Sequence, residues 1–300
     1  MRIVSLLPSA TEIVCELGLT DALVGVSHDC DFPADVLGKP VLSEAIVAAD
    51  QPSAAIDGRI RGEVHNGRSV YHLDATQLAR LRPDLILTQE LCTVCAPSAG
   101  LVQEAARGLA TAPRILSLEP HSVRDILQTI LLVGELTGTD ARAEALVGKL
   151  RGRIDAVGTP APGSRPRVVC LEWFDPLYVG GHWIPEMVAI AGGSDVLGRA
   201  GRPSVRVEWQ AVLDADPEVL VLMPCGFDLA RARAEAGLLT GRPGWGGIAA
   251  VREGRVYLTD ASAYFNRPGP RIVHGLEILA AILHPGTVSG ALPAAAVEPL

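Results

Sequence analysis

Two stretches of sequence decide the fold class: LARLRPDLIL at residues 78–87 and VLDADPEVLV at residues 212–221. Each begins like the end of a helix, continues with a proline and an acidic residue in a turn, and finishes in a short apolar strand. Outside these copies, short β-rich runs alternate with amphipathic helical runs, which is typical of α/β proteins. The repeat therefore predicts an α/β fold with two similar lobes.

The alternating pattern assigns elements to most of the chain. The predicted strands are residues 2–7, 23–26, 85–88, 114–117, 167–171, 219–223 and 255–259. The predicted helices are residues 75–81, 99–108, 123–136, 140–157, 184–191, 209–213, 229–236 and 270–283, with a further helix beginning near Ser9. Gly138-Thr139-Asp140 carries a stop signal followed by a new cap. We predict an N-terminal α/β lobe (1–120), a connecting helical segment and linker (121–164) and a C-terminal α/β lobe (165–300).

Composition excludes several classes of protein. The chain has 300 residues and a formal net charge of −8, and its mean hydropathy of +0.28 excludes a disordered chain. The acidic balance argues against nucleic acid or an anionic membrane surface as a partner. No apolar run approaches the roughly 18 to 20 residues that cross a bilayer, so no membrane insertion is expected.

The N-terminus bears on location. Met1-Arg2 leads directly into a short strand that Pro8 stops, without the apolar stretch and small-residue site of a secretory signal. We therefore expect a cytoplasmic protein, or a periplasmic one only if a leader has been removed. In a reducing compartment the six cysteines are expected to be thiols, metal ligands or redox groups and not disulfides.

Candidate ligand-binding residues lie where the predicted strands end, because ligands of open α/β sheets bind beyond the carboxyl ends of the strands. The candidates that share this place are Ser9, His28, Asp29, Phe32, Gln89, Cys92, Cys95, Glu172, Trp173, Phe174, Trp183, Cys225, Tyr264, Phe265 and Arg267. Aromatic residues make up only 4% of the chain. Their gathering at strand ends predicts a flat, largely apolar ligand in a cleft between the lobes.

Individual motifs leave alternatives open. Cys92-Thr93-Val94-Cys95 fits two buried thiols, a role at the ligand site, or zinc or redox chemistry. His28 and His182 are the histidines nearest the expected cleft, although a lone histidine is more often a satisfied polar group than a ligand. Arg267 could bind a carboxylate or phosphate, or form a surface ion pair. No phosphate loop or nucleophile elbow is present, so we predict no catalytic residues and no enzyme.

The order of several motifs resembles a known family. VSLLPSATE (4–12), DFP (31–33), LRPDLI (81–86), DPEVLV (216–221) and YFNRPGPR (264–271) follow one another as in the substrate-binding proteins of cobalamin and iron-chelate ABC importers. The resemblance covers nearly the whole chain. It implies two Rossmann-like α/β lobes joined by a long helix, with a corrinoid or related metal chelate clamped between them by aromatic rings.

Two features depart from that family's pattern. Its members present one acidic residue on each lobe to the permease, whereas the corresponding residues here are Thr76 and Gln210, with Asp74 and Glu208 two positions earlier. These departures, together with the N-terminus, weaken the expectation of docking to an ABC permease. The Cys-x-x-Cys motif, with a further cysteine at Cys225, looks like a leaderless subgroup usually labelled cobalamin-binding.

The sequence therefore supports three hypotheses. The first is an intracellular, non-enzymatic binding protein for a corrinoid or related metal macrocycle, in which a thiolate of Cys92 or Cys95 ligates or faces the metal. The second is a cytosolic metal-site or redox protein that uses Cys92, Cys95 and Cys225, with His28 or Cys30, to hold zinc, iron or a small cluster. The third is an importer receptor that lacks its leader.

Overall fold

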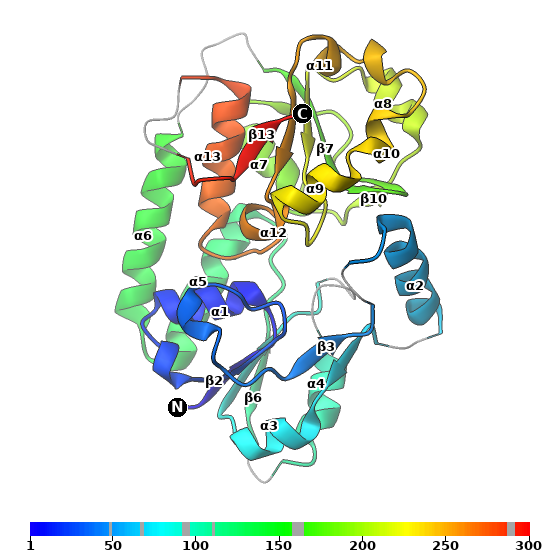
Figure 1. Cartoon of the computed structure of the whole chain (residues 1–300). Coiled ribbons are helices and arrows are strands. Elements are labelled where there is room, and N and C mark those ends of the chain that lie inside the picture. Colours follow the sequence, from blue (N-terminus) through cyan, green and yellow to red (C-terminus); the bar gives the residue numbers. More distant parts are fainter. Residues whose placement is uncertain (48–49, 67–68, 92–96, 110–111, 158–164, 287–291) are drawn as a thin grey trace. The chain divides into compact units, whose positions relative to one another are not determined.

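The structure of the protein is a computed structural model that describes residues 1–47, 50–66, 69–91, 97–109, 112–157, 165–286 and 292–300 (Figure 1). The chain forms two units, each with its own sheet. The first comprises Met1–Gln51, Ala55–Pro120 and Asp125–Gly148, and the second comprises Pro52–Ala54, His121–Arg124 and Lys149–Leu300. The predicted α/β class with two lobes is confirmed, while the lobe boundaries at residues 120 and 164 stay a prediction.

The first unit is built on a four-stranded sheet in which every pair of neighbours is parallel. Its order is β2-β1-β5-β6, with β1 at Ile3–Ser5, β2 at Leu23–Val26, β5 at Leu85–Thr88 and β6 at Arg114–Ser117. A separate antiparallel pair joins β3 (Ser43–Ala45) to β4 (Tyr71–Leu73). The helices of this part of the chain are α1 (Pro8–Glu16), α2 (Ser53–His65), α3 (Ala75–Leu81) and α4 (Ala99–Ala106), with short 3-10 turns at Thr20–Ala22 and Ala34–Val36.

The second unit contains a larger, mixed sheet with the order β10-β8-β7-β11-β12-β13 and with β9 also paired to β7. Its strands are β7 (Arg167–Phe174), β8 (Leu177–Val179), β9 (Ser194–Asp195), β10 (Val205–Arg206), β11 (Val219–Leu222), β12 (Val256–Thr259) and β13 (Val297–Pro299). Strands β7, β11 and β12 are parallel, and β8 and β13 run antiparallel to their neighbours β7 and β12. Its helices are α7 (Ile184–Ile190), α8 (Trp209–Ala215), α9 (Leu229–Glu235), α10 (Gly237–Thr240), α11 (Ala249–Arg252), α12 (Ala261–Tyr264) and α13 (Ile272–Leu283), with a 3-10 turn at Trp245–Gly247.

The repeated sequence motif forms the same local structure in both units. Helix α3 ends at Arg82 and helix α8 ends at Asp216, and both cap residues have a positive φ, 43° and 37°. The acidic residue after each proline then holds the start of a neighbouring strand: Asp84 Oδ2 accepts a hydrogen bond from Arg2 N (2.7 Å), and Glu218 Oε2 accepts one from Arg167 N (2.8 Å). Each motif thus ends a helix and aligns two parallel strands.

Two consecutive helices follow the first sheet. Helix α5 (Val123–Thr137) ends where Gly138 adopts a φ of 68°, and helix α6 (Asp140–Ala156) begins two residues later. The stop signal at residues 138–140 is therefore confirmed, and the helical connection consists of two helices. Gly134 allows their close approach, since a Cβ there would lie 2.5 Å from Cβ of Ala143. None of the helices in the described part of the chain is both long and apolar enough to cross a membrane.

Candidate ligand-binding site

The carboxyl ends of the four parallel strands bring several predicted residues to one edge of the first sheet. Ser9 follows β1 in the first turn of α1, His28 and Asp29 follow β2, and Gln89 follows β5. Strand β1 lies between β2 and β5, so the strands that follow it in sequence are added first on one side of it and then on the other. Open sheets bind ligands next to such a reversal of strand order. Ser9 and Gln89 are buried, and Gln89 Nε2 has no hydrogen-bond partner among the described residues.

His28 is fixed by its neighbours at this edge. Its Nδ1 lies 2.9 Å from Ser43 Oγ, its Nε2 lies 3.5 Å from a carboxylate oxygen of Asp29, and its ring centroid is 5.7 Å from that of Tyr71. Phe32, four residues later, leaves 42% of its surface exposed. This loop therefore offers an oriented imidazole and an exposed aromatic ring.

The cysteine hypotheses can be followed only in part. Cys92 and Cys95 lie outside the described residues. Cys30 is buried, and its Sγ lies 3.0 Å from Thr11 Oγ1 and 3.1 Å from Ser27 Oγ. These contacts place Cys30 in a hydroxyl network inside the first unit. Within the described ranges, no group of three or more His, Cys, Asp and Glu side chains is arranged to hold a metal ion.

Three loops meet at the carboxyl edge of the second sheet. Cys225, in the loop after β11, is exposed and donates its backbone N–H to the carbonyl oxygen of Glu172 on β7 (2.9 Å). The next residue, Gly226, donates its N–H to Oδ1 of Asn266 in the loop after α12 (3.1 Å). One backbone–backbone and one backbone–side-chain hydrogen bond thus join the loop after β11 to β7 and to the loop after α12. Asn266 lies within the motif at residues 264–271, but the contact of its amide with Gly226 was not predicted from the sequence.

Glu172 has a defined set of partners. Its carboxylate accepts hydrogen bonds from Gly181 N (3.2 Å) and from Ser204 Oγ. Gly181 lies so close to the chain that a Cβ there would be 2.3 Å from Ser204 N. Glu172 therefore positions the loops at 180–182 and 203–204 and does not stand free as an acid–base group. Its hydrogen bond with Ser204 was not predicted from the sequence.

Trp173 is half-buried against the core with its indole N–H directed at backbone carbonyls. Nε1 lies 3.1 Å from the carbonyl oxygen of Asp175 and 3.3 Å from that of Ser53. The indole meets the ring of Phe227 edge to face with 5.2 Å between centroids, and the Arg231 guanidinium lies 3.9 Å from the centroid of the Phe227 ring. Trp173 is thus a rigid aromatic surface at the end of β7.

Three predicted aromatic residues are buried and do not line an accessible surface. Phe174 and Phe265 are fully buried, and Trp183 is 6% exposed with its Nε1 donating to the carbonyl oxygen of Phe265 (2.9 Å). Consecutive residues of a strand point to opposite faces, so Phe174 packs into the core next to the half-exposed Trp173. The expectation that all the strand-end aromatics face the ligand is corrected for these three rings in this structure.

Tyr264 and Arg267 lie on either side of the end of α12. The Tyr264 ring is 6.1 Å from that of His274, and the Arg271 guanidinium lies 5.9 Å from the Tyr264 centroid. Arg267 donates to Ser262 Oγ (3.2 Å). Asp260 caps α12 by accepting from Ala263 N (2.9 Å), and burial raises the pKa of its carboxyl. This end of the sheet combines cationic side chains with an aromatic ring.

One pair of histidines emerges only from the structure. His121 and His182 have ring centroids 5.9 Å apart, and the pKa of His182 is lowered first by burial and then by the charge of His121. His182 was among the histidines that the sequence singled out. Its partner follows the predicted strand at 114–117, but nothing in the sequence links the two loops.

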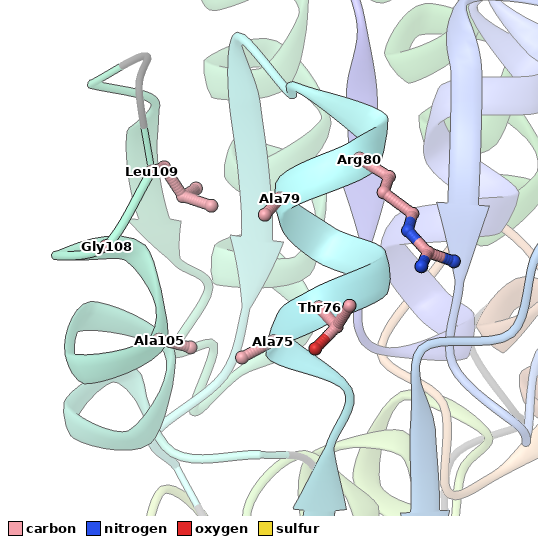
Figure 2. A pocket seen from close by; sticks show the side chains of 7 residues that line it. All are labelled: Ala75, Thr76, Ala79, Arg80, Ala105, Gly108 and Leu109. Carbon is pink, nitrogen blue, oxygen red and sulfur yellow. The ribbon is translucent and has the colours of Figure 1, made fainter.

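The positions that the resemblance assigns to permease docking carry no acid. Thr76 lies on α3, and Gln210 on α8 donates to Asp214 Oδ1 (2.7 Å). Asp74 caps α3 by accepting from Gln77 N (2.8 Å), while Glu208 is exposed at the start of α8. Helices α3 and α4 border an open groove of about 540 Å³ on the first unit, and Figure 2 shows Ala75 and Ala79 directed toward the side of Ala105 and Leu109.

Comparison with known proteins gives consistent relatives. An uncharacterized ABC transporter substrate-binding lipoprotein of Bacillus subtilis, YvrC, is 25% identical over 95% of this chain and 81% of its own length. A cobalamin-binding protein of Halobacterium salinarum is 27% identical over 96% of this chain and 70% of its own length. Among solved structures, a periplasmic heme-binding protein from Pseudomonas aeruginosa matches with a TM-score of 0.72 and 21% identity, covering 99% of this chain and 97% of that protein.

These matches have different weight. At 21% identity the structural match shows the fold alone. The family described as periplasmic binding protein matches residues 3–263, which is most of the chain. This family consists of non-enzymatic solute-binding proteins of ABC transporters, so family membership, and not a missing motif, confirms the prediction that the protein is not an enzyme. The chain belongs to the periplasmic binding protein family.

Proposed function

We propose that the protein binds a metal-containing macrocycle or chelate, with a corrinoid such as cobalamin as the favoured ligand and heme as the main competitor. The observation that carries the proposal is the relative of Halobacterium salinarum, described as a cobalamin-binding protein, which aligns over 96% of this chain. The strand-end residues support it, because they offer aromatic surface and hydrogen-bonding groups of the kind that a large, flat and partly polar ligand requires.

The second unit supplies two groups suited to such a ligand. Trp173 is held by its indole N–H and by the Phe227 ring, so its exposed part presents a rigid apolar surface. Arg267 is half-buried beside Ser262 and carries N–H donors in a fixed fork. A guanidinium in this place would bind a peripheral carboxylate, amide oxygen or phosphate of the ligand.

The test of the proposal is a titration of purified protein with aquocobalamin, followed by visible absorbance, with hemin in parallel. We expect saturable binding of aquocobalamin with a shifted spectrum, and about tenfold weaker binding by Arg267→Gln, because a charge-assisted hydrogen bond is lost. Arg252→Gln, on α11, is the matched control and should bind as the wild type does. If the protein binds neither aquocobalamin nor hemin, the proposal is contradicted.

The predicted contact between a cysteine and the metal needs its own experiment. Thiolates are good ligands for soft metal centres, so Cys92→Ala combined with Cys95→Ala should weaken binding or change the visible spectrum of the bound corrinoid. Cys15→Ser serves as the control, because Cys15 lies near the end of α1 and is not among the candidate ligand-binding residues. An unchanged spectrum and an unchanged affinity in the double variant would remove both thiols from the site.

Delivery of the ligand is a separate matter. Thr76 and Gln210 stand where the resemblance expects acidic docking residues, and we therefore infer transfer to an intracellular partner and not to a permease. Cell fractionation tests the location: recovery of the protein outside the cytoplasm would contradict this part of the proposal and would favour an importer receptor.

A further inference from the structure

We propose that His121 and His182 form a two-imidazole site for a first-row transition-metal ion such as Ni²⁺ or Zn²⁺. All seven histidines of the chain lie in the described residues. His121 and His182 are the two whose rings lie next to one another, with centroids 5.9 Å apart and ring planes inclined by 40°. Both residues belong to the second unit, although one follows β6 and the other follows β8.

The spacing of the rings fits a shared ion. Metal–nitrogen bonds of about 2.1 Å and a roughly tetrahedral angle place the centroids of two ligating imidazoles roughly 5 to 6 Å apart. The observed separation of 5.9 Å lies at the upper end of this range. The separation of the centroids is therefore compatible with one nitrogen of each ring binding the same ion.

The backbone holds His182 in an unusual conformation. Its φ is 49°, in the left-handed region where a glycine would be unstrained. Two hydrogen bonds fix it there: His182 N donates to the carbonyl oxygen of Arg202 (2.6 Å), and Gly201 N donates to that of His182 (2.8 Å). Non-glycine residues in such conformations cluster at ligand sites, and this one carries an imidazole.

His121 is held from the other side. Two residues after it, Val123 N donates to Oε2 of Glu186 (2.8 Å), and Glu186 lies in the first turn of α7, which begins directly after Trp183. One helix thus fixes the segments that carry both imidazoles. His121 is exposed, so an ion can approach the pair from solvent.

His182 also has a nitrogen that the protein does not use. Its Nδ1 is buried and has no hydrogen-bond partner among the described residues. A metal ion that accepted the lone pair of this nitrogen would supply the missing partner. No third His, Cys, Asp or Glu completes a site within the described ranges, so water or an exchangeable ligand would fill the other positions.

Imidazole nitrogens select the class of ion. They bind Zn²⁺, Ni²⁺, Co²⁺ and Cu²⁺, whereas Mg²⁺ and Ca²⁺ prefer oxygen ligands. We therefore expect affinity to rise from Co²⁺ to Ni²⁺ to Cu²⁺, in the usual order for nitrogen sites, and no response to Mg²⁺.

The experiment is a calorimetric titration of the purified full chain with Ni²⁺ alone, without any macrocycle. We expect one ion per chain. His121→Gln and His182→Asn should each lower the affinity for Ni²⁺ by roughly tenfold or more, since each removes one of two ligands. Asparagine tolerates a positive φ, so His182→Asn keeps the backbone conformation. The double variant, which lacks both imidazole ligands, should bind Ni²⁺ more weakly than either single variant.

The control is His72→Gln, an exposed histidine on β4 in the first unit, which should leave Ni²⁺ binding unchanged. If His182→Asn does not fold, His182→Gly provides the second variant, because glycine adopts the positive φ without strain. Absence of Ni²⁺ binding by the wild type, or wild-type affinity in the His121 and His182 variants, would overturn the proposal. Since no macrocycle is added, its failure is distinguishable from failure of the proposed corrinoid binding.

Discussion

The carboxyl group of Asp195 is largely removed from water. Its Oδ1 accepts hydrogen bonds from Leu197 N (3.1 Å) and Gly198 N (2.7 Å), whereas its Oδ2 is buried without a partner among the described residues. Burial raises its pKa from 3.8 to about 6, against the opposing effect of the two backbone N–H groups. A buried, unsatisfied oxygen thus outweighs two good hydrogen bonds.

This shift predicts a pH-dependent loss of stability. From about pH 4 to pH 6 the unfolded chain releases the Asp195 proton while the folded protein keeps it, so the free energy of unfolding falls as pH rises and the loss is complete above about pH 6. A shift of this size corresponds to about 3 kcal/mol. Asp195→Asn keeps an Oδ1 acceptor and should flatten the profile measured by urea unfolding between pH 4 and pH 7.

The control for this prediction is Asp155→Asn, at an exposed position on α6. Its pH profile of unfolding should run parallel to that of the wild type. If the profile of Asp195→Asn also runs parallel to the wild type, Asp195 does not titrate as its burial implies.

Gly181 tests the close packing around Glu172. A Cβ at this position would lie 2.3 Å from Ser204 N and 2.7 Å from the carbonyl carbon of Pro203, both backbone atoms that cannot move aside independently. Gly181→Ala should therefore lower the free energy of unfolding by about 1 to 3 kcal/mol, measured by urea unfolding. Gly237→Ala, where nothing lies within 4 Å of the added Cβ, should not destabilise the protein. Equal stability of the two variants would contradict the packing described here.

The side chains at the strand ends show which part of the site the sequence could predict. The alternation of strands and helices located the loops that follow the strands, and with them the candidates His28, Gln89, Trp173 and Arg267. It could not tell Trp173 from Phe174, because which face of a strand meets the core depends on tertiary packing. It also could not pair His121 with His182, since two loops far apart in sequence meet there.

At the scale of elements, the capped helix α3 offers a direct measurement. Asp74 is its N-cap, and its Oδ1 accepts from Gln77 N (2.8 Å). Asp74→Ala leaves that N–H unsatisfied and should destabilise the protein by about 1 kcal/mol in urea unfolding. Thr76→Ala, at an exposed position on the same helix, should have an effect within about 0.5 kcal/mol. If Asp74→Ala leaves the free energy of unfolding unchanged, the cap contributes nothing to stability.

Helices and strands that a sequence motif marks at their ends were predicted correctly, whereas α2 and β13, which no such motif marks, were missed. The proline–acid motifs carry helix ends and strand starts in the sequence itself, and their strands β5 and β11 form as predicted. Helix α2 was missed because Gly58 and Gly62 interrupt it and its apolar residues form a thin stripe, of which Val64 is 42% exposed. Strand β13 was missed because it exists only through antiparallel pairing with β12.

At the scale of the molecule, the family and the fold class agree with the sequence. The repeated motif predicts two α/β lobes, and each unit has a sheet with parallel strands at its centre. A shared fold does not determine which ligand a protein binds, because proteins of one fold carry different binding sites. Sequence therefore supports the family directly and the ligand only as a proposal.

Corrinoid binding is tested most simply by a calorimetric titration of the purified wild-type chain with aquocobalamin. We expect one binding site per chain with a dissociation constant of about 1 µM or lower, equivalent to at least roughly 8 kcal/mol of binding free energy. Absence of binding to aquocobalamin, with hemin bound in its place, would redirect the proposal to heme. Absence of binding to both macrocycles would contradict the proposed binding of a metal-containing macrocycle.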